Sequence, residues 1–587
     1  MLIGWGRIVR RVLSDDEGGG WPVDVWAGWA AGTVFLQVWH FALPVDWRAA
    51  AVVGLVGLAG WMLRRRPASA EIAHAFATGA VCLVLYALFV RHIRSDLLVY
   101  DAGMYYYQAI RWINEYPVVF GLGNLNLQLG INQTYFLWAG LLNLHPVGRG
   151  GFMTMNCLAL VIAMAPGVRT LLRMRRADPK PDALGILRIF SLPVLAAFAM
   201  DDGTANPSPD VFSWVLCVVA FERAAAWLHA AGTGPDRTLR PPYVLVLICA
   251  ALVTVKMSML VYSAVLLAVV ATVYIVRMRA CLSRPHLLRH AALAALVALA
   301  GGLPWMVRNS MATGYPLFPS PVAALPVEWR IPEPKVRSIG ELIRAWARHP
   351  SKQSKAFRKR LGNEQENILL GRSDPMSQAA FRNLVRGTPW FSEWIADSMR
   401  STIFAAGLCG PPVLGLALLL LRRRDKPGGA TARSLDPLVI PLGAAVAFWL
   451  YAAPAVRFGL PFLALLLLLP CAQVCAGLPM RPASLRWLAG ILSAVLTAAA
   501  FANGFPPRSK LWNSIVFPPR AMAETVPFTT RSGLVVTIPK NDARSFDSPL
   551  PATFYRNPYL SLLDPDRGIA GGFKDETPPP PAEAAGG

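Results

Sequence analysis

The chain has 587 residues, of which 55% are hydrophobic and 16% charged, and its mean hydropathy is +0.42. Soluble domains carry about a quarter of charged residues, so this composition excludes an ordinary soluble enzyme and predicts an all-α polytopic membrane protein. The formal net charge of +23 does not indicate nucleic-acid binding, because Lys and Arg gather at the ends of apolar segments, as in the cytoplasmic loops of membrane proteins.

Apolar segments of about 16–21 residues recur along the chain, and this length crosses a hydrocarbon core of about 30 Å. We expect about thirteen transmembrane helices at residues 24–43, 47–63, 71–91, 149–171, 185–200, 209–230, 241–256, 258–277, 287–306, 402–421, 436–452, 457–476 and 486–505. Basic clusters flank alternate segments, so the positive-inside rule predicts a cytoplasmic N-terminus at residues 1–23 and an extracytoplasmic C-terminus.

This topology places two large loops on the outer face of a transmembrane domain that covers residues 24–505. The first loop, 92–148, contains an apolar stretch at 134–145 that is too short to span, so we expect a re-entrant or interfacial segment. The second loop, 307–401, contains apolar residues at helical spacing beside arginines at 336–349. That pattern predicts an amphipathic helix on the membrane surface.

The last part of the chain has no apolar segment of spanning length. We expect an extracytoplasmic tail at 506–573, with a strand at 534–538, followed by a disordered end at 574–587. Seven of the eight cysteines lie in apolar segments and none shows zinc-type spacing, which argues against a disulfide framework. No cluster of His and Asp indicates a required metal, and we expect no cofactor.

Carboxylates mark two of the outward segments. Asp96 and Asp101 open the first loop, and Asp210 begins an apolar segment after the turn-rich stretch DDGTANPSPD. An outward carboxylate at the membrane surface can act as a general base on an acceptor hydroxyl. The alternative is structural, because acidic residues also end helices and begin new ones near the positive end of the helix dipole.

Cations occur at the outer ends of three other segments. Lys256 interrupts a long apolar stretch, Arg308 and Asn309 follow the ninth predicted span, and Arg457 lies between two spans. A charge at membrane depth indicates a site, although a long side chain can also extend to the interface as a simple anchor. Together the three cations could hold a phosphate or pyrophosphate.

Several pieces of the chain resemble the GT-C superfamily of integral-membrane glycosyltransferases, and more closely a bacterial family of GT-C-like membrane proteins without settled function. The matching pieces, between about residues 96 and 573, are YDAGMYYYQAIRWINEYPVVFGLGNL, NPSPD, VKMS, PWMVRNSMATGYPLFPSP, APAVRFG and SPLPATFYRNPYLSLLDPDRGIAGGF. The resemblance implies lipid-phosphate sugar donors and an essential acid in the first outer loop. That role falls on Asp101 or Asp96, and Tyr105, Gln108 and Asn124 become candidates for substrate binding.

The chain departs from this family in three places. Cysteines in the family's tail are replaced here by Ser545 or Phe546 and by Ala552, so a disulfide there is lost. Tyrosines at 105–107 replace a more usual Leu-Tyr-His, which removes a possible base or metal ligand. Many GT-C enzymes have two adjacent acids in this loop, whereas the two acids here are separated in the sequence.

The leading hypothesis is a membrane glycosyltransferase of the bacterial inner membrane. It would move a sugar from a polyprenyl-phosphate donor to a glycan, lipid or protein acceptor of the cell envelope, and its partners would also include membrane lipids. Alternatives are a polysaccharide polymerase or ligase, a transporter or flippase of lipid-linked substrates, and a non-enzymatic scaffold for envelope assembly. Transport is disfavoured because polar residues gather at one face and no internal repeat is apparent.

Overall fold

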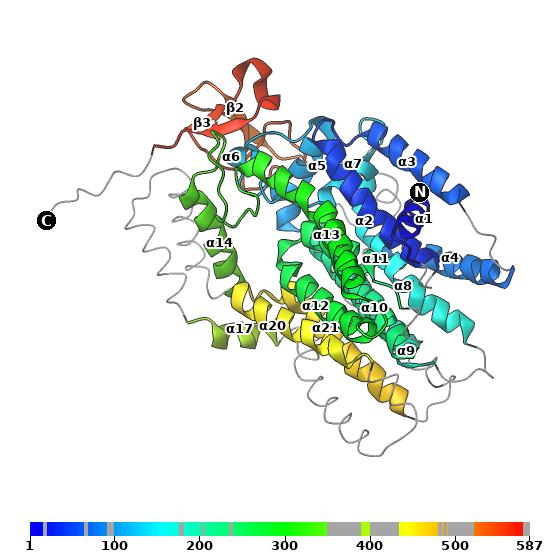
Figure 1. Cartoon of the computed structure of the whole chain (residues 1–587). Coiled ribbons are helices and arrows are strands. Elements are labelled where there is room, and N and C mark those ends of the chain that lie inside the picture. The colour runs from blue at the N-terminus through cyan, green and yellow to red at the C-terminus, as the bar shows by residue number, and fades with distance from the viewer. Residues whose placement is uncertain are drawn as a thin grey trace.

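The structure is a computed structural model that describes residues 1–15, 20–63, 69–90, 99–148, 150–174, 181–199, 201, 203–204, 206–233, 239–348, 389–399, 434–478, 484, 490 and 522–578. These residues are mostly helical, which confirms the predicted all-α membrane class (Figure 1). The predicted span at 402–421 lies outside the described residues, and so does the span at 486–505 except for residue 490.

The described helices are, in chain order, α1 (Leu2–Val12), α2 (Trp21–His40), α3 (Trp47–Met62), α4 (Ser69–Val90), the π-helical turn η1 (Ala102–Tyr106), α5 (Tyr107–Glu115), α6 (Leu122–Leu125), α7 (Tyr135–Asn143), η2 (Gly151–Thr154), α8 (Met155–Arg173), α9 (Ala183–Ala199), α10 (Pro209–Thr233), α11 (Tyr243–Val255), η4 (Met257–Met259), α12 (Leu260–Met278), α13 (Arg284–Thr313), α14 (Glu333–Arg348), α17 (Phe391–Ser398), η6 (Asp436–Leu438), α20 (Val439–Ala452) and α21 (Val456–Gly477). The long helices pack side by side as a bundle, with the chain's last described segment over one end (Figure 1).

Six helical segments of the described chain are long and apolar enough to cross a membrane: Ile72–Val90, Gly151–Arg173, Pro209–Gly232, Met257–Met278, Arg284–Thr313 and Val456–Gly477. Of the predicted spans that fall in the described part of the chain, six are thus long and apolar enough, and the prediction of thirteen spans is not reached there. Four further predicted spans fold as shorter apolar helices of 10–17 residues, at or below the lower limit of about 17 for a crossing helix. The span predicted at 24–43 forms α2, which is not among the six segments. Asp24 and the Trp and Gly residues of α2 lower the mean hydropathy of this helix.

The N-terminal stretch predicted as a plain cytoplasmic segment contains α1, which packs against α2 and α3 through glycines. A Cβ added at Gly4 would lie 1.7 Å from the carbonyl oxygen of Gly57, and one at Gly6 would lie 1.8 Å from that of Asp24. Arg10 Nη1 also lies 2.7 Å from Asp24 Oδ1, so part of the basic cluster is neutralised by an acid within α2.

The first large loop folds into η1, α5, α6 and α7. The apolar stretch at 134–145 forms α7, whose nine residues extend for about 13.5 Å, far short of a hydrocarbon core. Nearly all of α7 is buried. This agrees with the prediction of a short segment that does not span. The amphipathic helix predicted at 336–349 is confirmed as α14.

The C-terminal tail is a small folded unit in its described part, 522–578. Strand β1 (Thr525–Thr529) pairs antiparallel with β2 (Val535–Pro539), and β3 (Leu560–Leu562) pairs antiparallel with β4 (Phe573–Asp575). A 3-10 turn, η8 (Pro565–Ala570), lies between β3 and β4. The strand at 534–538 is confirmed, but disorder from residue 574 is wrong, because residues 574 and 575 pair with β3.

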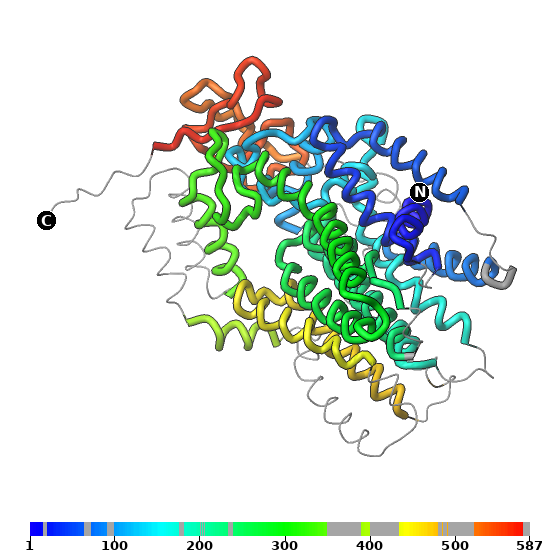
Figure 2. Tube along the Cα trace, viewed as in Figure 1, coloured from blue at the N-terminus to red at the C-terminus, as the bar shows by residue number. Residues whose placement is uncertain are grey.

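The tail lies over the first loop (Figure 2). The side-chain amide of Gln108 donates to the carbonyl oxygens of Phe546 and Ser548, both at 2.9 Å. The backbone N–H of Phe573 donates to Phe120 O at 2.9 Å. A buried ion pair between Lys335 and Asp575 joins the tail to α14. The tail therefore caps the loop that carries Asp101.

Candidate functional site

Four of the predicted site residues form one charged network. Arg457 Nη1 lies 3.5 Å from Asp101 Oδ2, and Arg457 Nε lies 3.6 Å from Asp210 Oδ2. Lys256 Nζ forms an ion pair with Asp210 Oδ1. Two carboxylates and two cations are thus combined, and their formal charges cancel. The paired residues are 46 positions apart in the case of Asp210 and Lys256 and 356 positions apart in the case of Asp101 and Arg457, and the fold brings all four together.

Helix ends position each member of this network. Asp210 lies in the first turn of α10, Lys256 follows the last residue of α11 in extended conformation, and Arg457 lies in the first turn of α21. The indole N–H of Trp214 donates to Arg457 O at 2.8 Å, which fixes the start of α21 against α10. Asp101 precedes the π-helical turn η1, a conformation frequent at functional sites.

The two carboxylates differ in access and in partners. The side chain of Asp210 is 14% exposed and contacts both cations. The side chain of Asp101 is 25% exposed, and its ion-pair contact among the described residues is the long one to Arg457. Burial raises the pKa of Asp101 above its ordinary value, and the positive charge of Arg457 offsets part of this effect. Asp101 is therefore the acid better placed to exchange a proton with a ligand.

Aromatic rings form the inner wall beside the network. Lys256 Nζ lies 3.9 Å from the centre of the Phe458 ring, a cation–π contact. The rings of Tyr105 and Tyr106 are 4.6 Å apart, and Tyr106 lies 5.4 Å from Phe136. Tyr105 is buried, so it contributes to this wall rather than offering an open hydroxyl.

Arg308 lies in a second group of polar residues, apart from the charged network. Its side chain is buried, with 4% of the residue exposed, and no described carboxylate pairs with it. Its Nη2 donates to His40 Nδ1 at 3.3 Å, so the other ring nitrogen of His40 can donate to Tyr116 O at 3.1 Å. The Nε and Nη1 donors of Arg308 have no partner among the described residues.

A cavity of about 50 Å³ adjoins this arginine. Its lining includes His40, Gln133, Phe136 and Arg308. The volume exceeds the roughly 10–15 Å³ that one water molecule needs, so a polar occupant fits. Phe136 contacts Tyr106 and also lines this cavity, so the aromatic cluster extends as far as the cavity beside Arg308.

The structure therefore changes the expected three-cation clamp. Lys256 and Arg457 are neutralised by carboxylates, whereas Arg308 has no compensating carboxylate in the described part of the chain. His40 was not among the predicted site residues. In the sequence, His40 is recognisable only as a titratable residue near the end of an apolar segment. Such residues are too common in membrane proteins to indicate a functional site.

Three predicted binding residues have structural partners instead. Gln108 holds the tail, Asn124 donates to Trp329 O at 2.8 Å, and Asn309 donates to Pro316 O at 2.9 Å. All three are buried. Asp96, the alternative catalytic acid, lies outside the described residues. Within the described part of the chain, no group of three or more His, Cys, Asp or Glu side chains is arranged to hold a metal ion.

The fold defines an α-helical membrane protein whose polar site is built from the ends of several apolar helices. The chain belongs to the family described as a domain of unknown function (DUF8201), which matches residues 1–362, more than half of its length. The match includes Asp101, Asp210, Lys256 and Arg308 but ends before Arg457 and the tail. No curated protein and no solved structure matches the chain significantly.

Proposed function

We propose that this protein is a membrane glycosyltransferase that moves a sugar from a polyprenyl-phosphate donor to an envelope glycan, lipid or protein. One combination carries the proposal: Asp101 is a partly exposed carboxylate, and Arg308 is a buried cation with no counter-ion among the described residues, beside a cavity that the aromatic cluster also lines. Such a pair supplies a base and a phosphate-binding group to one reaction.

Arg308 supports the phosphate part of the proposal. An unpaired charge in a protein interior costs several kcal/mol, and an anionic ligand removes most of that cost. Arg308 lines the cavity, and its Nε and Nη1 donors have no partner among the described residues. Guanidinium groups bind phosphate through paired N–H donors. A lipid-linked phosphate therefore fits this position better than the neutral network around Arg457.

Asp101 supports the proton-transfer part. Its carboxylate accepts the proton of an acceptor hydroxyl, whose oxygen forms a bond to the anomeric carbon of the sugar. The bond between that carbon and the phosphate oxygen breaks, and the phosphate leaves with the bonding electrons beside Arg308. Arg457 favours the ionised form of Asp101, and Asp210 with Lys256 holds Arg457 in place.

The topology completes the proposal. With the N-terminus cytoplasmic, the polar helix ends and the tail face the outside of a bacterial inner membrane, where lipid-linked sugars are presented. A polymerase or ligase would use the same donor chemistry with a glycan acceptor. A flippase or transporter is less well supported, because the described charges gather at helix ends rather than along a path through the bundle.

The test is sugar transfer by the purified protein in lipid nanodiscs with a panel of radiolabelled polyprenyl-phosphate sugars and membrane-extracted acceptors. Wild-type protein is expected to transfer at least one sugar and to release the polyprenyl phosphate. The Asp101→Asn variant is expected to lose about 10²–10⁴-fold in rate, the usual contribution of a general base. The control is Asp566→Asn, an exposed tail acid outside the site. Absence of transfer with every donor, or a fully active Asp101→Asn variant, contradicts the proposal.

A further inference from the structure

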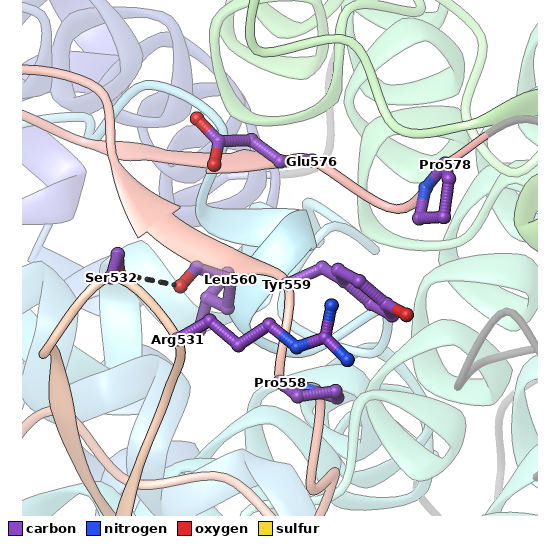
Figure 3. Close-up of a pocket in the computed structure, with 7 residues that line it drawn as sticks. All are labelled: Arg531, Ser532, Pro558, Tyr559, Leu560, Glu576 and Pro578. Carbon is purple, nitrogen blue, oxygen red and sulfur yellow. Dashed lines mark hydrogen bonds between the residues drawn. The ribbon is translucent and has the colours of Figure 1, made fainter.

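The tail contains a groove of about 320 Å³, distinct from the charged network and from the Arg308 cavity. It is lined by Arg531, Ser532, Pro558, Tyr559, Leu560, Glu576 and Pro578 (Figure 3). Arg531 and Ser532 come from the turn between β1 and β2, and the others come from β3, the segment before it and the segment after β4. No residue of the groove belongs to the proposed reaction centre.

Arg531 is the group of this groove with unused binding capacity. Its guanidinium carbon lies 4.5 Å from the centre of the Tyr559 ring, and its backbone N–H donates to Pro558 O at 2.9 Å. In Figure 3 the guanidinium lies beside this ring, whereas the carboxylate of Glu576 points away from it. No carboxylate of the described residues pairs with Arg531, so its N–H donors face the groove while the ring holds the side chain in place.

The rest of the lining supplies apolar ring faces, and its one acid is compensated. Pro558, Tyr559 and Pro578 present rings to the groove. Glu576 lies 3.1 Å from Lys574 Nζ, so its negative charge is compensated from outside the groove. The hydroxyl of Ser532 donates to Leu560 O at 3.0 Å and is already used. The formal charge that remains uncompensated is that of Arg531.

We propose that this groove binds a sugar ring that carries a carboxylate, such as a uronic-acid unit of an acidic glycan. The planar fork of Arg531 matches a carboxylate through two N–H donors, and the proline and tyrosine rings match the apolar C–H face of a pyranose. The volume lies at the lower end of the roughly 300–1,000 Å³ typical of small-molecule sites, which suits a short saccharide segment.

Other anions use these features less completely. Inorganic phosphate would satisfy Arg531 but would make no contact with the two proline rings. A neutral sugar would contact the rings but would leave the guanidinium unpaired. The inference does not depend on the transfer reaction, since the groove shares no residue with that site. Its role would be to hold an acidic glycan next to the membrane domain.

The test is calorimetric titration of the full-length protein in nanodiscs with a glucuronic-acid oligosaccharide and with a glucose oligosaccharide of the same length. The acidic ligand is expected to bind, and the neutral one to bind at least about tenfold more weakly, as the loss of one charge-assisted pair predicts. Arg531→Gln is expected to weaken binding of the acidic ligand about tenfold, and Arg531→Lys to weaken it less, because charge remains without the fork.

The matched control is Arg556→Gln, an exposed arginine of the same tail outside the groove, which should bind as the wild type does. Asp101→Asn should also keep full affinity, which separates this site from the transfer reaction. No binding, equal affinity for both oligosaccharides, unchanged affinity in Arg531→Gln, or tighter binding of an acidic peptide would each overturn the proposal. Hydrogen exchange over residues 522–578 verifies that each variant remains folded.

Discussion

At the scale of single residues, the site depends on which charges have partners. Arg457 and Lys256 contribute to a neutral network, so they position Asp101 and Asp210 rather than attract a free anion. Arg308 is the reverse case, because its charge is buried and, of its three nitrogens, Nη2 alone has a partner among the described residues, in a bond to His40. A buried arginine of this kind is destabilising until an anion binds.

This contrast predicts the effect of Arg308→Gln on lipid binding. The variant should bind polyprenyl phosphate at least about tenfold more weakly, the loss of one charge-assisted hydrogen-bonded contact. Its stability without lipid should equal or exceed that of the wild type, because an unpaired buried charge is removed. Binding is measured by native mass spectrometry of nanodisc complexes, and stability by thermal unfolding.

Arg330→Gln provides the control, since Arg330 is exposed in the chain segment after α13. Equal lipid affinity in the Arg308 and Arg330 variants would show that the cavity does not hold the phosphate.

At the scale of elements, close helix packing begins at the N-terminus. Helix α1 is short and strongly amphipathic, and it approaches α2 and α3 where glycines remove the side chains. Gly57 and Gly54 lie on the same helix but in different surroundings. A Cβ at Gly57 would lie 2.6 Å from Met1 O, whereas a Cβ at Gly54 would meet nothing within 4 Å.

Gly57→Leu should therefore separate α1 from α3. Overpacking against backbone costs about 1–3 kcal/mol, so the unfolding temperature should fall and a protease site placed near residue 12 should become accessible. Gly54→Leu, the matched substitution on α3, should leave both properties unchanged. A similar loss in both variants would mean that helix propensity, rather than the contact with α1, sets the effect.

At the scale of the whole molecule, the tail belongs to the membrane domain rather than forming an appendage. Lys335 of α14 and Asp575 of β4 form an ion pair whose side chains are 6% and 1% exposed. Gln108 and Thr553 add hydrogen bonds between the first loop and the tail, the latter from Thr553 Oγ1 to Leu125 O at 2.8 Å. Tail docking and the shape of the loop that carries Asp101 are thus coupled.

Asp575→Asn should release the tail. The variant leaves Lys335 buried without its counter-ion, a loss of about 3–5 kcal/mol, so hydrogen exchange should increase across residues 522–578 and in the first loop. The double variant Lys335→Met and Asp575→Leu should restore protection, because no charge remains buried. Glu524→Gln, which breaks an exposed pair with Lys540, should change little. Protection that stays at the wild-type level in Asp575→Asn would rule out this coupling.

The sequence predicted the members of the charged network because the topology expected from the apolar segments and basic clusters groups alternate helix ends on one face. Asp101, Asp210, Lys256 and Arg457 could be grouped in this way without knowing their contacts. Their pairing could not be predicted, since it depends on side-chain geometry at distances of a few ångströms. The structural roles of Gln108 and Asn124 were missed for a different reason. Both side chains donate to backbone carbonyl oxygens far away in the sequence, in the tail and, for Asn124, also at Trp329. Such long-range contacts leave no periodic pattern in the sequence.

The pH dependence of sugar transfer, compared between wild type and Asp101→Asn, tests the central claim most directly. Because burial raises the pKa of Asp101, the ionised base is lost as pH falls through a value above the ordinary carboxyl pKa of about 3.9. The wild-type rate should therefore rise with pH through an acidic limb. In Asp101→Asn that limb should be absent and the rate about 10²–10⁴-fold lower. An Asp101→Asn protein with the wild-type rate and the same acidic limb would contradict the account.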